Sequence, residues 1–240
     1  MPRFFKEYFK DAPFIDGDDA RHIIRSLRMR VGETLTVCDT MGTDYLCEIA
    51  EMDDETVRLN LLEETENRTE PTVKVTLFQC NPKGDKLDMV VQKAVELGIS
   101  EIVPVLSEHC VSRPDGKSAG KKRERMQKIA DEAAKQSGRG KLPSIGEFIS
   151  FKECCKRLND FDKSILFYEL GGKPIVEIVN EDIKSIAIVI GPEGGFSKAE
   201  VESAKENGAD IATLGARILR TETAPLAAIT AIMLLTNNLN

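Results

Sequence analysis

The chain of 240 residues is long enough for one or two domains. Its content of 41% hydrophobic and 30% charged residues excludes a disordered chain and a collagen-like repeat. The 33 Lys and Arg residues against 40 Asp and Glu residues give a net charge of −7, which excludes a uniformly basic surface but leaves room for a local basic patch.

The cysteines and the chain ends indicate a soluble cytoplasmic protein. Six scattered cysteines with no CxxC pair predict reduced thiols, and with only two histidines we expect no metal site. The first residues, MPRFFKEYFKD, lack the apolar stretch of a signal peptide. The longest apolar run, 224–235, is shorter than the roughly 20 residues of a membrane span, so we expect no membrane partner.

Residues 1–70 show the pattern of a small β-barrel with one helix. A helix is predicted over 18–29, with Asp18 or Asp19 as N-cap and Ile23, Ile24 and Leu27 on one apolar stripe. Around it, we predict strands over 33–37, 44–50 and 56–61 and a turn over 39–43. The polar segment 63–71 ends in Pro and is predicted to be the linker.

From residue 72 onward, strands alternate with helices. Strands are predicted over 73–79, 102–106, 165–170, 186–190 and 211–214, and helices over 87–95 and 121–137. Gly98 is suited to end the first of these helices, and Ser197 with Glu200 forms a capping box that begins a later one. This alternation predicts a parallel sheet with helices on both faces.

The basic residues cluster in two segments of this otherwise acidic chain. Residues 21–30 contain four Arg and no acid, and residues 117–141 carry a net charge of +6, whereas 44–70 carries −8. Arg21, Arg25 and Arg28 share one predicted helix face that could lie along a phosphate backbone. A solvated helix surface explains the same pattern, and the sequence leaves both interpretations open.

Two loops follow predicted strands and precede predicted helices. The first, which we call the glycine loop, has the sequence GPEGGFS over 191–197. Its glycines permit positive φ angles and close approach of the backbone to a ligand at the carboxyl end of the sheet. The second, the arginine loop, covers 214–224 and mixes apolar residues with Arg217, Arg220 and Glu222, as expected of a pocket wall. A tight turn and a helix N-cap segment are the respective structural alternatives.

Other nucleotide-site motifs are missing. The dinucleotide fingerprint GxGxxG does not occur, and the GKS at 116–118 lacks the first glycine of a P-loop because Val111 occupies that position. No GxSxG elbow occurs either, which removes the commonest serine hydrolase arrangement.

Five motifs in order resemble those of one enzyme family. The glycine loop and the arginine loop, LGARILRTETA, resemble the cofactor loops of SPOUT methyltransferases, and more narrowly those of bacterial enzymes that methylate N3 of a uracil in 16S ribosomal RNA. The same order continues in RHIIRSLRMRVGE (21–33), KGDKLDMVVQKAVELGISEIVPVLSEHC (83–110) and DEAAKQSGRGKLP (131–143). The resemblance covers nearly the whole chain.

The resemblance implies an α/β fold with two domains. Residues 1–70 would form a PUA-like, RNA-binding β-barrel, and residues 71–240 a SPOUT methyltransferase domain with a C-terminal trefoil knot. It further implies a homodimer that uses S-adenosylmethionine to methylate uracil N3 in 16S ribosomal RNA, as naked RNA or in the small ribosomal subunit, during rRNA processing and ribosome biogenesis.

The implied site falls into three groups of residues. We expect Arg220 to stabilise the developing uracil anion and Glu222 to take the imide proton or orient Arg220; a structural Arg220–Glu222 ion pair is the alternative. The expected cofactor-binding residues are Leu166, Phe167, Glu169, Ile190, Gly191, Pro192, Gly194, Gly195, Leu214, Gly215, Ile218, Leu219, Thr223 and Ala224. The expected RNA-binding residues are Arg3, Arg25, Arg28, Lys83, Lys86, Gln136 and Arg139.

Two other functions remain open from the sequence. One is a non-catalytic RNA-binding or assembly factor that retains the fold. The other is a nucleotide-binding enzyme whose glycine loop holds phosphate, which would bind ATP and not S-adenosylmethionine.

Overall fold

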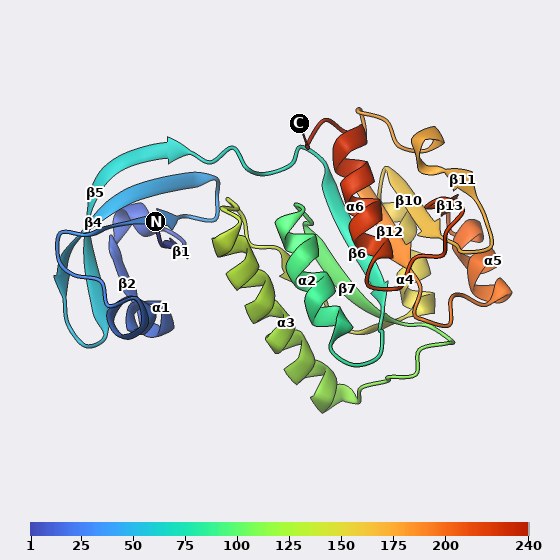
Figure 1. The fold of residues 1–240 in the computed structure, drawn as a ribbon, viewed down its shortest axis with the longest axis horizontal. Coiled ribbons are helices and arrows are strands. Elements are labelled where there is room, and N and C mark those ends of the chain that lie inside the picture. Colours follow the sequence, from blue (N-terminus) through green and yellow to red (C-terminus); the bar gives the residue numbers. More distant parts are fainter. Residues whose placement is uncertain (240) are drawn as a thin grey trace. The chain divides into compact units, whose positions relative to one another are not determined.

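The computed structural model describes residues 1–239, which form two compact units (Figure 1). Unit 1 contains residues 1–70 together with 134–142, and unit 2 contains 71–133 and the chain from 143 onward. The sequence predicts a second domain that is continuous from residue 71, whereas the structure places residues 134–142 in unit 1. The cause is a set of hydrogen bonds between this segment and unit 1, among them Asn67 to the Gly138 carbonyl and Arg139 to Glu70.

Unit 1 is a curled five-stranded sheet over one apolar core. Its strands are β1 (Arg3–Phe5), β2 (Phe14–Asp16), β3 (Thr34–Cys38), β4 (Thr43–Met52) and β5 (Thr56–Glu66), in the order β1-β3-β4-β5-β2. Alternate residues of β3 and β4 are buried, including Leu35, Val37, Cys47 and Ile49, because side chains of a strand point to opposite faces. The predicted strands are therefore present, with β1 and β2 added.

The predicted helix of unit 1 differs from the observed one. Helix α1 (Gly17–Arg21) begins after Asp16, two residues before the predicted cap, and continues as a π-helical turn over His22–Leu27. Arg28 follows with φ of 54° in the left-handed region. The wider turn rotates the side chains, so Ile23 is fully buried while Leu27 is 40% exposed. Arg28 therefore lies beyond the helix and not on a face shared with Arg21 and Arg25.

The predicted linker is partly strand. Strand β5 continues to Glu66 and pairs Glu63 with Leu46 and Glu66 with Thr43. The backbone of these solvent-exposed acidic residues still forms the hydrogen-bond ladder between β4 and β5, and the acidic composition of the segment does not predict this pairing. The predicted turn over 39–43, between β3 and β4, is also present, with Asp39 Oδ1 accepting hydrogen bonds from the backbone N–H groups of Met41 and Thr43.

Unit 2 is built on a parallel sheet, as predicted. Its strands are β6 (Lys74–Cys80), β7 (Glu101–Leu106), β8 (Ser144–Ile145), β9 (Ile149–Ser150), β10 (Lys163–Phe167), β11 (Lys173–Pro174), β12 (Ser185–Ile190) and β13 (Asp210–Thr213). The order is β11-β13-β10-β12-β6-β7-β8, with β9 beside β7, and every pairing is parallel.

Five helices belong wholly or mainly to unit 2. They are α2 (Lys86–Glu96), α3 (Gly116–Gln136), α4 (Phe151–Arg157), α5 (Lys198–Glu206) and α6 (Ala224–Leu235), and 3₁₀ turns occur over Phe9–Asp11, Leu158–Asp160 and Ile175–Glu177. Helix α2 ends as predicted, with Gly98 at φ of 97° just beyond its last turn. The predicted capping box at Ser197 and Glu200 begins α5.

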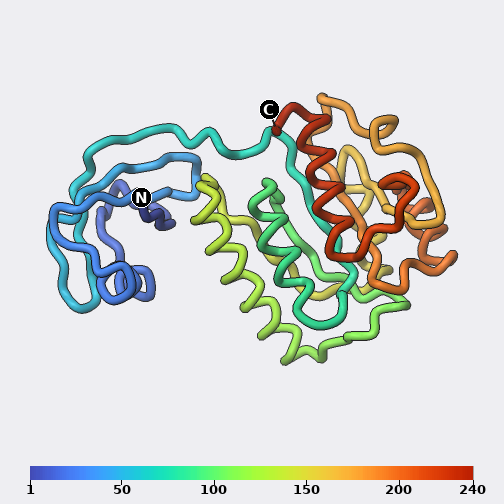
Figure 2. The backbone as a smooth tube through the Cα atoms, in the orientation of Figure 1, coloured from blue at the N-terminus to red at the C-terminus, as the bar shows by residue number. Residues whose placement is uncertain are grey.

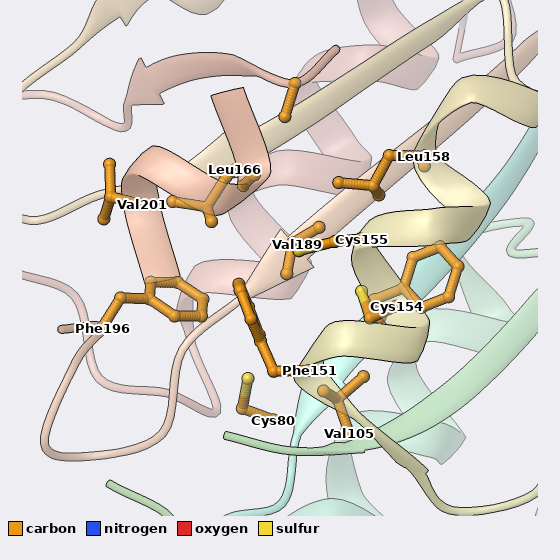
Figure 3. Packing of buried hydrophobic residues seen from close by; sticks show 14 of the residues in the cluster. Cys80, Val105, Phe151, Cys154, Cys155, Leu158, Leu166, Val189, Phe196 and Val201 are labelled. Carbon is orange, nitrogen blue, oxygen red and sulfur yellow. The ribbon is translucent and has the colours of Figure 1, made fainter. Parts of the chain in front are cut away.

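The helices pack on both faces of this sheet. Helix α6 packs on α2, β6 and β12, whereas α4 and α5 enclose a separate core with the other face (Figure 3). Strand β12 shows how side chains alternate between the two faces, since every second residue, Ala187 and Val189, belongs to the core under α4 and α5. Both faces of the central strands are therefore covered, which explains why they are continuous apolar runs.

Strand β13 and helix α6 follow one another in the chain but meet different strands of the sheet. Strand β13 pairs with β10, while α6 contacts β6 and β12, so the arginine loop crosses the carboxyl ends of the strands between them (Figure 2). The glycine loop follows β12 at the same edge. The topology thus brings both loops to one place.

Candidate cofactor site and RNA-holding residues

A cavity of about 580 Å³ lies at this carboxyl edge of the sheet, within unit 2. Its walls come from the segments that follow β10, β12 and β13, with Lys86 of α2 and Ala224 of α6. Most of the predicted cofactor-binding residues line it: Phe167, Glu169, Ile190, Gly191, Pro192, Gly194, Gly195, Leu214, Gly215, Ile218, Leu219 and Ala224.

Two predicted cofactor-binding residues do not line the cavity. Leu166 is fully buried in the α4–α5 core, where Figure 3 shows it among Val189 and Val201. Because side chains alternate along β10, its neighbour Phe167 faces the cavity instead. Thr223 is an exposed residue at the N-cap of α6. The structure therefore does not bring these two residues to the cavity wall.

The glycine loop is compact, and two of its glycines leave little room for a side chain. Gly195 has φ of 65°, and a Cβ there would collide with the carboxylate of Glu169. A Cβ on Gly194 would lie 3.0 Å from Cβ of His109. The backbone closes on itself through a hydrogen bond of 3.0 Å from Gly195 N–H to the Pro192 carbonyl. The loop therefore presents bare backbone to the cavity.

Phe196 anchors the glycine loop in the core. Its ring is 5% exposed and lies 5.6 Å, centroid to centroid, from Phe151 of α4 (Figure 3). A Cβ on Gly191 would lie 3.1 Å from the same ring. The sequence analysis did not single out Phe196, although a lone aromatic residue within a polar glycine-rich turn was the available signal.

A buried hydrogen-bond relay joins the two loops. Gln79, at the end of β6, donates to Thr221 Oγ1 over 3.1 Å, and Thr221 donates to the Gly191 carbonyl over 2.7 Å. Both side chains are buried, at 0% and 5% exposed. Among the residues that the structure describes, Gln79 Oε1 has no hydrogen-bond partner. The sequence analysis missed this relay because its members are far apart in the chain.

Lys86 forms an ionic clamp between the two loops. Its ammonium lies 3.0 Å from Glu193 Oε1 in the glycine loop and 3.2 Å from Glu222 Oε2 in the arginine loop. The hydrogen bond to Glu193 raises the pKa of Lys86 above its ordinary value. Burial by itself raises the pKa of Glu193, but the hydrogen bond from Lys86 outweighs it and holds that pKa below its usual range.

Of the two predicted catalytic residues, Arg220 lines the cavity and Glu222 does not. The side chain of Arg220 is 83% exposed, and that of Glu222 is 14% exposed. Their closest atoms, Arg220 Nη1 and Glu222 Oε1, are 4.0 Å apart, so the alternative of a tight structural ion pair is not favoured. Glu222 is held by Lys86, which leaves the guanidinium of Arg220 open to a substrate.

Two of the predicted RNA-binding residues, Arg3 and Arg139, are held in ion pairs within unit 1. Arg3 pairs with Asp44 at 2.6 Å, and Arg139, 4% exposed, pairs with Glu70 at 2.8 Å. Burial raises the pKa of Glu70, but the hydrogen bonds from Arg139 and from the Gly140 and Lys141 backbone outweigh it and hold that pKa low. Removing either cation would strand a half-buried carboxylate, so neither guanidinium is available to a phosphate.

The remaining predicted RNA-binding residues are of two kinds, one already ion-paired and the others exposed. Lys86 is engaged by the clamp, whereas Arg25, Arg28, Lys83 and Gln136 are exposed. Much of the basic segment 117–141 is also paired within its own unit: Lys122 with Asn81, Arg123 with Glu147, Arg125 with Asp88, Lys135 with Asp19 and Arg139 with Glu70. The net charge of this segment therefore overstates what it can offer to phosphate.

The part of the chain that the structure describes holds neither a cluster of metal ligands nor a membrane-spanning helix. No group of three or more His, Cys, Asp or Glu side chains within residues 1–239 is placed to hold a metal ion. Over the same part of the chain, no helix has the length and apolar character needed to cross a membrane.

A parallel α/β unit with a backbone-lined cavity at its carboxyl edge, joined to a curled β unit, defines a class of two-domain cofactor-binding enzymes. The family models identify the parts. An RNA methyltransferase domain matches residues 68–233, and an RNA methyltransferase PUA domain matches 15–62. The chain belongs to this RNA methyltransferase family.

Individual relatives resemble it over their whole length. The ribosomal RNA small subunit methyltransferase E of Bacillus subtilis is 39% identical over 97% of this chain and 96% of its own. The crystal structure of the corresponding protein of Neisseria gonorrhoeae, bound to S-adenosyl methionine, matches with a TM-score of 0.87 and 34% identity over 98% of each chain. A Legionella pneumophila structure with bound S-adenosyl methionine matches with a TM-score of 0.89 and 26% identity, over 98% of this chain and 97% of that one.

Proposed function

We propose that this chain methylates N3 of a uracil in 16S ribosomal RNA of the small ribosomal subunit, with S-adenosylmethionine as methyl donor. The observation that carries the proposal is the cavity between the glycine and arginine loops, with Arg220 at its wall and the carboxylate of Glu222 4.0 Å from Arg220. Relatives named as small-subunit ribosomal RNA methyltransferases align over the whole chain and support the choice of substrate.

The residues of the cavity fit this cofactor. Its volume of about 580 Å³ is within the range of roughly 300–1,000 Å³ typical of small-molecule sites. Ile190, Leu214 and Leu219 supply apolar wall for an adenine ring, and the close-packed glycines expose backbone groups for polar contacts. Glu169 and Glu193 place carboxylates at a wall where a positively charged donor would lie. When bound, the cofactor supplies a methyl group activated by its positive sulfur.

Arg220 and Glu222 prepare the uracil for transfer. The imide proton on N3 must leave before or as the new bond forms, and Glu222 accepts it. The negative charge that develops on the uracil oxygens is stabilised by the guanidinium of Arg220, which is exposed enough to reach a substrate. The ammonium of Lys86 lies 3.2 Å from Glu222 Oε2 and fixes the place of this carboxylate, so Lys86 acts as a positioning residue. N3 lies on the pairing edge, so the base must be unpaired or flipped out.

RNA is held by the exposed cations that have no ion-pair partner within the described residues. Arg25, Arg28 and Lys83 meet this condition, and Gln136 is exposed at the end of α3. Because Arg28 has φ of 54°, Arg28→Asn removes the charge at a residue type that tolerates this conformation, whereas Ala adds backbone strain. The salt dependence of RNA binding, measured by filter retention, should flatten by about one unit in this variant. An unchanged slope would remove Arg28 from the RNA surface.

The C-terminal part forms a trefoil knot in this proposal. Support comes from the arginine loop, which leaves β13 at one side of β10 and returns to the sheet centre, where Thr221 meets Gln79 of β6. A knotted chain pulled by its ends in a force measurement shortens by the length trapped in the knot. Extension to the full contour of the unfolded chain would contradict it.

A cytoplasmic homodimer completes the proposal. Helix α6 is apolar at every residue except Thr230, and Leu234 on it is 56% exposed, as suits a face that meets a second copy. Sedimentation analysis should give twice the mass of 26.6 kDa. All six cysteines are buried free thiols, consistent with a reducing compartment.

The decisive experiment is mass mapping of modified ribosomal RNA from cells with and without this protein, paired with radiolabelled methyl transfer to small subunits in vitro. We expect one methylated uracil to be lost from the cells and restored by the purified protein. Cofactor binding without methyl transfer would instead favour a non-catalytic assembly factor. Binding of ATP in place of S-adenosylmethionine would favour a nucleotide-binding enzyme.

A further inference from the structure

The segment between β7 and α3 lies against the glycine loop from outside the cavity. His109 in this segment does not line the cavity, although Gly194 and Gly195 do. Its Nδ1 lies 2.9 Å from the Gly194 carbonyl oxygen and 3.2 Å from the Gly195 carbonyl oxygen. Its Cβ is also in contact range of Gly194, since a Cβ there would lie 3.0 Å from it.

The chemistry of this contact fixes the state of the ring. Both partners of Nδ1 are carbonyl oxygens, which only accept hydrogen bonds, so Nδ1 of His109 must carry the hydrogen. A peptide group is planar, and its N–H points opposite to its C=O. Holding the two carbonyls therefore sets the direction of the next two N–H groups: that of Gly195, which donates to the Pro192 carbonyl within the loop, and that of Phe196.

The segment that carries His109 is itself fixed. The backbone N–H of Glu108 donates to Glu200 Oε1 over 2.8 Å, and the guanidinium of Arg113 donates to the Ser107 and Glu108 carbonyls. Glu200 is 8% exposed and closes the capping box of α5 with Ser197. The backbone next to His109 is therefore held in place by hydrogen bonds from both sides of the segment.

On the opposite side of the turn stands Glu169. Its carboxylate occupies the space that a side chain on Gly195 would need. The two glycines are therefore enclosed between His109, outside the cavity, and Glu169, which lines it. A ligand that approaches the glycine backbone meets a surface whose peptide planes are already oriented.

We propose that His109 is a positioning residue for the cofactor: its Nδ1–H orients the Gly194 and Gly195 peptide groups and so prepares the glycine loop to bind S-adenosylmethionine. The inference rests on the proposed use of the cavity for that cofactor. His109 acts through the backbone and does not touch the reacting atoms. Its loss raises the KM for S-adenosylmethionine and leaves kcat and the KM for RNA unaltered.

Two substitutions separate the hydrogen bond from the packing. His109→Leu keeps a side chain of similar bulk without a donor, and His109→Asn keeps an N–H donor one bond from Cγ, where Nδ1 stands. Calorimetric titration of S-adenosylmethionine into the full chain should show about tenfold weaker binding for His109→Leu, the value of one to two hydrogen bonds. His109→Asn should bind S-adenosylmethionine with an affinity within about threefold of that of the wild type. The control variant His22→Asn should bind it with the affinity of the wild type.

A second measurement does not depend on affinity. The chain has two histidines, so ¹⁵N-histidine labelling gives only two rings to assign, and His22→Asn identifies the remaining one. At a pH where the ring is neutral, His109 should carry its hydrogen on Nδ1, the less common tautomer in free histidine.

The outcomes distinguish this inference from the proposed function. Equal affinity of wild type and His109→Leu, equal weakness of the Leu and Asn variants, or a hydrogen on Nε2 would each overturn the role of His109. A loss of kcat at unaltered KM would do the same. If the wild type itself fails to bind S-adenosylmethionine, the proposed function falls with it.

Discussion

The glycine loop and the arginine loop meet at one cavity, but they are fixed by different means. The glycine loop is enclosed by His109 and Glu169 and anchored through the Phe196 ring in the core. The arginine loop is exposed over most of its length, with Ile218 at 78% and the Arg220 side chain at 83%. One wall is therefore preformed, while the other offers side chains to an incoming partner.

This difference suggests a division of work. A preformed backbone surface binds a small molecule without first having to be ordered, which favours affinity. Exposed side chains on the facing loop are suited to a large substrate that covers them on binding. Substitutions in the first loop should accordingly change cofactor affinity, and substitutions in the second should change the rate on RNA.

The largest effect is expected at Arg220. Arg220→Ala removes the cation that we propose to stabilise charge on the uracil, and kcat should fall by roughly 100- to 1,000-fold. Affinity for S-adenosylmethionine should change little. Single-turnover methyl transfer and calorimetry measure the two quantities, with Lys205→Ala, an exposed cation of α5, as the control. A near-normal kcat would place charge stabilisation elsewhere.

Gly195 should give the next largest effect, with the opposite signature. Gly195→Ala introduces a Cβ at φ of 65° and against the Glu169 carboxylate. Left-handed backbone costs an alanine about 1–2 kcal/mol, so cofactor affinity should fall about tenfold or more. Gly194→Ala, where no positive φ is involved, should lose less. If both variants bound the cofactor like the wild type, the glycine loop would not be the preformed wall.

Thr221 tests the relay that joins the two loops. Thr221→Val removes the hydroxyl between Gln79 and the Gly191 carbonyl and leaves both without their partner. Stability should fall by about 1–3 kcal/mol, measured by urea unfolding, with several-fold weaker cofactor binding. Thr221→Ser keeps the hydroxyl and should recover most of both. If the Ser variant were as unstable as Val, the lost methyl contact and not the relay would be responsible.

The ionic clamp should give the smallest effect. Lys86→Met frees Glu193 and Glu222, and because the clamp is partly exposed, cofactor affinity should fall only about two- to threefold. Because the pKa of Lys86 is raised in the folded protein, its contribution is fully present below the ordinary value of 10.5 and is lost as pH rises through the higher pKa of the folded state. The lowered pKa of Glu193 means that its contribution is present above 4.5 and is lost in more acidic solution.

The affinity difference between wild type and Lys86→Met should therefore be constant from about pH 5 to pH 10. Titrations at three pH values within this window check it. A difference that grows or vanishes near neutral pH would mean that another group controls the clamp.

Local patterns in the sequence were enough to predict much of this fold. The β-branched runs of β6, β7 and β12 and the capping box at Ser197 depend on neighbours within a few residues, and the structure confirms them. The glycine-rich segments were equally visible, because so many glycines in a strand-to-helix turn have few uses other than close approach.

Long-range pairing could not be predicted from the same patterns. Arg139 is basic and lies in a basic segment, yet its partner Glu70 is 69 residues away in the chain. Lys86 likewise meets its two carboxylates only when both loops fold over the sheet. The π-helical turn that displaces Arg28 also has no sequence rule that would have found it. Charge shows where cations are, but only the fold shows which of them are already paired.

The return of residues 134–142 to unit 1 has a consequence for how the protein is made. Translation delivers the strands of the first unit early, but Arg139, which neutralises the half-buried Glu70, is added only after two strands of unit 2 and the whole of α3. A nascent chain therefore waits with an incomplete first unit while the second has begun. Unit 1 is therefore completed by a residue that follows its carboxylate partner by 69 positions in the chain.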